Sequence, residues 1–192
     1  MESFEQICRV SLEAEGFAVS GNIKFFVRRR TKRPDRIEHQ THGYEVDLVG
    51  ARAGELVLAE VKSFLGSGGV SRQGFQALAK EGSRSRVSLF KLFNDASLRK
   101  KVIAEACERY GYGPSEVRMR LYVGKVAGGH EQEVRALLAR RRSPPVEVIG
   151  LKEIVAGLVE QAERRAYIDD PVLTTVKALS AAGLLSQGNP EG

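Results

Sequence analysis

Two neighbouring extended segments, 43–50 and 55–65, constrain the fold of this chain more than any other feature of its sequence. Both are rich in β-branched and apolar residues, and only four residues separate them. The last two of those four are Ala53 and Gly54, and glycine adopts the backbone angles of a tight turn at little steric cost. We therefore predict an antiparallel β-hairpin with a two-residue turn at Ala53 and Gly54.

The register of this hairpin would gather charged side chains on one face. It places Asp47 opposite Glu60 and Glu45 opposite Lys62, and directly opposite residues share a face. The other face is predicted to be apolar throughout, with Val46, Leu48, Val57, Ala59 and Val61. Because burying a charge is costly unless it is paired or bound to a metal, the charged face calls for an explanation.

Two interpretations of the charged face remain open. In the first, Asp47 and Glu60 are ligands of Mg²⁺, with Mn²⁺ as a substitute, and Lys62 positions the water that attacks a phosphodiester. In the second, the face is solvated and its charges pair across the two strands. The residue types favour the first interpretation, because carboxylate oxygens suit Mg²⁺ and an ammonium suits a phosphate.

The order of these residues resembles a nuclease pattern, which the chain presents as Glu5 on a first helix, then Glu45-Val46-Asp47, and after twelve residues Glu60-Val61-Lys62. The pattern is similar to the PD-(D/E)xK nuclease superfamily, and closest to Holliday-junction resolvases and Mrr-type restriction enzymes. Val46 precedes Asp47 where the pattern often has proline. The resemblance implies a divalent-metal-dependent DNA endonuclease, a Mg²⁺-dependent phosphodiesterase. Its catalytic set would be Asp47, Glu60 and Lys62, with Glu5 as a further metal ligand.

A basic segment points to a polyanionic partner. Its cations fall within thirteen positions: Lys24, Arg28, Arg29, Arg30, Lys32, Arg33 and Arg36. The chain carries a net charge of +6, and this density suits successive phosphates of DNA. We expect Pro34 to interrupt regular structure, so that the segment projects as an arm whose Arg28, Arg29, Arg30, Lys32 and Arg33 contact nucleic acid. The alternative is a solvated, flexible loop.

The rest of the sequence predicts an α/β fold: a restriction-endonuclease-like mixed sheet flanked by helices, with additional C-terminal helices. Helices are expected over 3–15, 95–110, 131–141, 151–165 and 171–183, and further strands over 117–126 and 146–149. We expect a nuclease-like domain over 1–168 and a C-terminal helix with a frayed tail over 169–192.

Composition excludes several other classes of protein. No apolar run approaches the roughly 18 to 20 residues of a membrane span, and the first residues lack the layout of a signal peptide, so a cytoplasmic protein is expected. Cys8 and Cys107 are the two cysteines, and each lies on an apolar helical pattern. This usage excludes a disulfide framework and predicts reduced, buried thiols.

Two alternatives to the nuclease hypothesis stay open. The first is a non-catalytic nucleic-acid-binding or regulatory protein on the same scaffold. The second is a DNA-binding regulator that uses the helix after Asp170-Pro171, which resembles the recognition helix of winged-helix regulators. Packing against the core, or against a second copy of the chain in a homodimer, explains the apolar face of that helix equally well.

Overall fold

The computed structural model describes residues 2–32, 37–75, 88–140, 144–164 and 169–185, and only the backbone of 29–32, 37 and 38. Its elements are α1 (Ser3–Ala14), β1 (Ala18–Lys32), β2 (Ile37–Arg52), β3 (Glu55–Lys62), η1 (Arg72–Gly74), α3 (Lys91–Asn94), α4 (Ala96–Tyr110), η2 (Pro114–Glu116), β4 (Val117–Val123), α5 (Glu131–Ala139), β5 (Val146–Gly150), α6 (Leu151–Arg164) and α7 (Pro171–Ala181). None of the described helices is long and apolar enough to cross a membrane.

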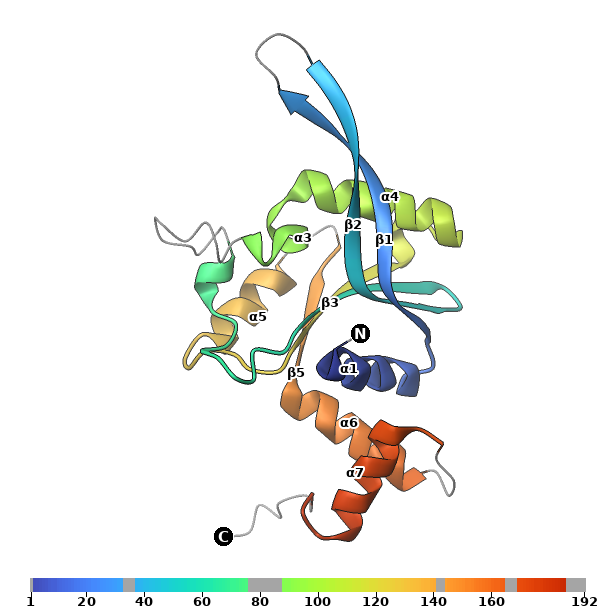
Figure 1. Cartoon of the computed structure of the whole chain (residues 1–192), viewed down its shortest axis with the longest axis vertical. Coiled ribbons are helices and arrows are strands. Elements are labelled where there is room, and N and C mark those ends of the chain that lie inside the picture. Colours follow the sequence, from blue (N-terminus) through green and yellow to red (C-terminus); the bar gives the residue numbers. More distant parts are fainter. Residues whose placement is uncertain (1, 33–36, 76–87, 141–143, 165–168, 186–192) are drawn as a thin grey trace.

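The strands form one sheet in the order β1-β2-β3-β4-β5 (Figure 1). The β1–β2 and β2–β3 pairs are antiparallel, and the β3–β4 and β4–β5 pairs are parallel. Parallel neighbours need a crossover connection, and α3 and α4 lie in the first crossover and α5 in the second. The predicted α/β class, with a mixed sheet flanked by helices and additional helices at the C-terminal end, is confirmed.

Strand β3 is anchored on both faces of the sheet. Val57 and Ala59 pack in a core with α1, α6 and α7, whereas Leu56 and Leu58 pack in a second core with α3, α4 and α5. All four side chains are fully buried, and each large one contributes about 1.5 to 3 kcal/mol through burial. This double anchoring fixes the alternation of β3 and hence the direction of the polar residues at its end.

The β2–β3 hairpin has the predicted turn and register. Its ladder runs from the Arg52–Glu55 pair to the Leu48–Ala59 pair around a turn at Ala53 and Gly54. Gly54 has a φ of 72°, in the left-handed region that glycine adopts without steric strain. The turn and the register were therefore predicted correctly as far as the Leu48–Ala59 pair.

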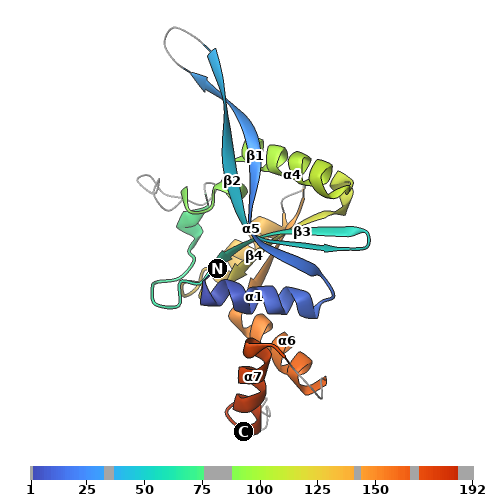
Figure 2. The same cartoon turned by 45° about the vertical axis from the view of Figure 1, so that its right-hand side comes forward.

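The described part of the basic segment, up to Lys32, is β-strand, whereas the sequence left open the alternative of a loop for it. β1 and β2 stay paired from Ala18–Ala51 out to Lys32–Ile37, and this long hairpin projects from the body of the molecule (Figures 1 and 2). Backbone pairing satisfies the N–H and C=O groups of residues whose charges alone suggested a loop. Pro34, where we expect an interruption of regular structure, lies outside the described residues. We call the paired residues from Ile23–Val46 out to Lys32–Ile37 the arm.

The last helix, α7, packs on its own chain. It contacts α6 and α1, and its Leu173 is buried in the core on the α1 face. The carboxylate of Asp170 caps the helix by accepting from the N–H groups of Val172 and Leu173. In both views α7 lies at the end of the molecule opposite the arm (Figures 1 and 2).

Candidate functional site

Asp47, Glu60 and Lys62 lie together where β2 and β3 part. The Nζ atom of Lys62 is 3.2 Å from Oε2 of Glu60 and 3.6 Å from Oδ2 of Asp47. The same Asp47 oxygen accepts a hydrogen bond of 2.6 Å from the N–H of Val61. The Asp47 carboxylate thus holds β3 just beyond the Leu48–Ala59 pair, where the ladder ends. The three side chains predicted from the hairpin register are therefore brought into one cluster.

An irregularity in β1 sets the geometry at Asp47. Asn22 has a φ of 54°, and the Asn22–Asp47 pair is missing from an otherwise regular ladder. At the same level of β2 the alternation of side chains is broken. Val46 packs in the core under α4, whereas Leu48 packs in the core under α1. The expectation that Val46 and Leu48 share a face is therefore wrong.

Glu45 does not join the cluster, although the register predicted it opposite Lys62. Its side chain is exposed and forms an ion pair of 3.9 Å with Lys24 on β1. Nδ2 of Asn22 donates to the other Glu45 oxygen at 3.5 Å. The expected pair failed because the β2–β3 ladder ends before Glu45, so that this residue follows β1 instead. The cluster has two carboxylates, not three.

Glu60 is the most buried member of the cluster, with a relative exposure of 4%. Its Oε1 accepts a hydrogen bond of 3.0 Å from Tyr44, and its Oε2 faces Lys62. Burial raises the pKa of Glu60, the Asp47 charge raises it further, and the contacts with Lys62 and Tyr44 only partly oppose this. The folded protein therefore binds a proton at Glu60 more tightly than the unfolded chain does.

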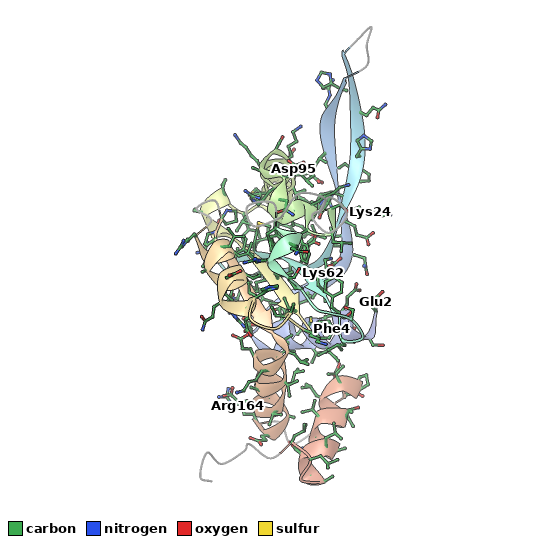
Figure 3. The ribbon with its side chains drawn as sticks, turned by 90° about the vertical axis from the view of Figure 1, so that its left-hand side faces the viewer. Glu2, Phe4, Lys24, Lys62, Asp95 and Arg164 are labelled. Atoms are coloured by element: carbon green, nitrogen blue, oxygen red, sulfur yellow. The ribbon has the colours of Figure 1, made fainter. Side chains whose placement is uncertain are left out.

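The side chain of Lys62 lies in the body of the molecule, between the arm and the C-terminal helices (Figure 3). It remains an ammonium at neutral pH. Burial lowers its pKa, but the charges of Glu60 and Asp47 outweigh burial, and the net pKa is raised. An ammonium donates hydrogen bonds and stabilises negative charge, whereas it cannot accept a proton. The geometry accordingly supports a role for Lys62 as a cation and donor, and not as a general base.

Tyr44 is a site residue that the sequence analysis missed. Its hydroxyl donates to Glu60 and accepts from the backbone N–H of Leu92 in α3. Burial and the Glu60 charge raise the pKa of this hydroxyl, which keeps it protonated as a donor. Tyr44 alternates along β2 with Val46 and Leu48, and this pattern favours an apolar contact for its ring. Nothing in the sequence places Leu92 beside this strand, so the hydrogen bonds of the hydroxyl could not be predicted.

We expect Tyr44→Phe to destabilise the metal-free protein by about 1 to 3 kcal/mol at neutral pH, because it leaves a buried carboxylate oxygen without its donor. Thermal unfolding in chelator measures this loss. Tyr112→Phe is the matched control, since the Tyr112 hydroxyl donates to the neutral backbone oxygen of Arg52 at 3.1 Å near the surface. Equal losses in the two variants would show that Tyr44 has no special relation to Glu60.

The raised pKa of Glu60 predicts how stability depends on pH. Stability from protonated Glu60 is fully present below the ordinary Glu pKa, near 4.5, and is lost as pH rises through the higher folded pKa. In chelator, the stability of Glu60→Gln relative to the wild type should therefore increase as pH rises from the ordinary Glu pKa through the raised folded pKa of Glu60. Urea unfolding of both proteins across this range measures the difference.

Glu153 provides the control of opposite sign. Burial raises its pKa, but hydrogen bonds from Arg135 and the Gly150 N–H outweigh burial, and the net pKa is lowered. Stability from Glu153 is present above the ordinary Glu pKa and is lost as pH falls. Glu153→Gln should thus be less stable than the wild type at neutral pH, and the two proteins should be equally stable in acid. A Glu60→Gln difference that did not change with pH would contradict the burial argument.

Glu5 lies near the cluster but is engaged in its own helix. Its Oε2 accepts from the N–H of Glu2 at 3.1 Å, within the capping box that begins α1. Among the described residues, no three His, Cys, Asp or Glu side chains lie close enough to hold a metal. Burial, then Glu5, then Asp47 raise the pKa of Cys8, so both carboxylates act on this thiol and it stays protonated. Glu5 and Asp47 therefore both lie near Cys8, and the role of Glu5 as a further metal ligand stays a prediction.

The donor set fits a hard divalent cation. Asp47 and Glu60 offer carboxylate oxygens, and one Asp47 oxygen makes no hydrogen bond with any described residue. Mg²⁺ characteristically binds one or two carboxylates and completes its coordination with water and substrate oxygens. The protonated Cys8 thiol is no competitor, because metals bind the thiolate. These residues therefore suit Mg²⁺ or Mn²⁺ better than zinc.

The predicted nucleic-acid contacts lie along β1. The described side chains of Lys24 and Arg28 are exposed, and Lys24 has a side-chain exposure of 64%. The side chains of Arg29, Arg30 and Lys32, and the whole of Arg33, lie outside the described part of the chain.

A second buried charge, Arg120, lies on the α1 face of the sheet. Its guanidinium binds Glu15 through two contacts of 2.7 and 2.8 Å and Glu147 through one of 2.8 Å. It also donates to the Tyr122 hydroxyl at 3.2 Å. With its donors engaged by protein groups, Arg120 links α1, β4 and β5 and offers nothing to a ligand.

Comparison with known proteins does not assign a family. No family model matches the chain, and no curated protein matches it. A solved structure, described as the crystal structure of AF1548, a protein of unknown function, is similar with a TM-score of 0.39 and 15% identity. The match covers 94% of this chain and 77% of that one.

Proposed function

We propose that this protein is a divalent-metal-dependent DNA endonuclease of the PD-(D/E)xK type that acts in the cytoplasm. The observation that carries the proposal is the position of Lys62, whose ammonium lies within 4 Å of two carboxylates on a neighbouring pair of strands. The order of these residues along a hairpin behind a helix, in a chain of net charge +6, supports the same conclusion.

Asp47 and Glu60 would hold the cation. When bound, Mg²⁺ or Mn²⁺ neutralises the scissile phosphate and acidifies a bound water. The chain itself supplies orientation and charge. Tyr44 and the Val61 N–H fix the two carboxylates, and the Lys62 ammonium donates toward the phosphate and the attacking water.

Cleavage of DNA tests this function directly. Purified protein would be incubated with supercoiled, linear, single-stranded and branched DNA in Mg²⁺, in Mn²⁺ and in chelator. We expect cleavage of at least one substrate in the presence of a divalent ion and none in chelator. A protein that binds DNA but cleaves none of these substrates in either metal would overturn the nuclease proposal.

A second candidate is a non-catalytic nucleic-acid-binding protein on the same scaffold. One observation favours it: Lys62 already forms ion pairs with both Glu60 and Asp47, so that each carboxylate has a cationic partner without a metal. Under this hypothesis, thermal unfolding would show no stabilisation by Mg²⁺. Under the nuclease hypothesis, Mg²⁺ raises the melting temperature because it binds the folded state alone.

A further inference from the structure

The arm is fixed to the body of the protein by helix α4. Arg109 donates from Nη1 to the backbone oxygen of Lys24 at 3.0 Å, and Lys101 donates to the backbone oxygen of Arg28. The Arg109 guanidinium also lies over the Phe25 ring, 4.8 Å from its centroid. These contacts follow β1 for five residues, so α4 sets the direction in which the arm leaves the sheet (Figure 2).

The arm begins at the candidate site and has a defined length. The missing Asn22–Asp47 pair marks its base, and the Lys32–Ile37 pair is its last described pair. Ten residues of β-strand lie between these levels, which corresponds to about 33 Å at the usual rise per residue. One turn of B-DNA, about 10 base pairs, has nearly the same length.

The charge of this segment matches a DNA backbone. Seven Lys and Arg residues and only two acidic residues lie between positions 24 and 42. The described cations at the base, Lys24 and Arg28, are exposed, and so are Lys100 and Lys101 on the adjacent part of α4. Double-stranded DNA presents one negative charge about every 1.7 Å, so a straight cationic arm of this length meets many phosphates.

We propose that the arm lies along duplex DNA for about one helical turn on one side of the scissile phosphate. The inference rests on the proposed function for the position of the scissile phosphate. It adds the substrate class, which is DNA with about 10 base pairs of duplex on one side of the cleavage site. On a shorter duplex, part of the arm would have no phosphates to contact. α4 makes the arm a rigid extension of the site.

The salt dependence of binding tests this inference. The slope of the logarithm of the binding constant against the logarithm of the salt concentration is proportional to the number of phosphates contacted. This slope does not depend on how many equivalent positions along the DNA the protein can occupy. Binding would be measured in chelator, by fluorescence anisotropy at several salt concentrations, on hairpin-closed duplexes of about 6 to about 24 base pairs. For the wild type, the slope should increase with duplex length up to about 12 to 16 base pairs and then stay constant.

A shortened variant removes the outer part of the arm and keeps the part of it that packs on α4. Residues 29–40 are replaced by Asn-Gly, which closes a two-residue turn on the Arg28–Thr41 pair. Val27, buried in the α4 core, and the Lys101 contact at Arg28 are retained. Compared with the wild type, the slope of this variant should become constant at shorter duplexes, and its constant value should be smaller in magnitude by about 3. Its affinity for long duplexes should be at least about tenfold weaker than that of the wild type.

Equal slopes for the wild type and the shortened variant at every duplex length would overturn the inference, and so would a wild-type slope that does not change with length. The result is independent of cleavage, because binding is measured without metal. A wild type that cleaves DNA but shows no slope difference refutes only the role of the arm. A wild type that shows the slope difference but cleaves nothing refutes only the nuclease.

Discussion

Asp47→Asn and Glu60→Gln should each reduce divalent-ion-dependent cleavage at least about a thousandfold while sparing DNA binding. Each variant keeps the size of the side chain and removes a charge that the cation needs. In Asp47→Asn, the side-chain amide oxygen takes over as acceptor for the Val61 N–H, so the strand contact is kept. Cleavage rates in Mg²⁺ and in Mn²⁺, with binding in chelator, measure the two properties separately.

Affinity for DNA in chelator should be unchanged or higher in these variants. The two carboxylates repel an incoming phosphate, and neutralising one of them relieves that repulsion. Glu45→Gln is the matched control, because Glu45 lies two residues from Asp47 on the same strand but is exposed and paired with Lys24. This control should cleave like the wild type. Wild-type cleavage by both site variants would remove Asp47 and Glu60 from the chemistry.

The sequence was informative about the hairpin because a tight turn and strand alternation are local properties. Gly54 fixed the turn, the turn fixed the register, and the register placed Asp47 beside Glu60. The apolar residues that flank Glu60 in β3 predicted its burial in the same way. Helix α7 was also predictable, since Asp170 and Pro171 form a local start signal.

Features that depend on distant contacts could not be predicted from the sequence. Tyr44 meets Glu60 because Leu92, far along the chain, lies against the same strand. Val46 and Leu48 pack in different cores at an irregular level of the β1–β2 ladder, where Asn22 of the other strand adopts a left-handed conformation. The described part of the basic segment, up to Lys32, is strand because β2 pairs with it, and composition reports charge but not a pairing partner.

Lys62→Met should lower the cleavage rate by about 10² to 10⁴-fold while leaving the metal ligands in place. Methionine keeps much of the length and apolar stem of lysine but cannot donate a hydrogen bond or carry charge. Single-turnover cleavage at saturating Mg²⁺ measures this effect on the chemical step.

Metal binding should distinguish this variant from the carboxylate variants. Without the ammonium, Glu60 and Asp47 repel each other, so metal-free Lys62→Met should be less stable than the wild type and Mg²⁺ should stabilise it more. Lys24→Met is the control, because Lys24 also faces a carboxylate of β2, at 3.9 Å, but on an exposed surface. It should leave the chemical step unchanged, since screened surface pairs contribute little. Cleavage by Lys62→Met within about twofold of the wild type would show that the ammonium serves only to neutralise the two carboxylates, and its role in the proposed site would then be structural.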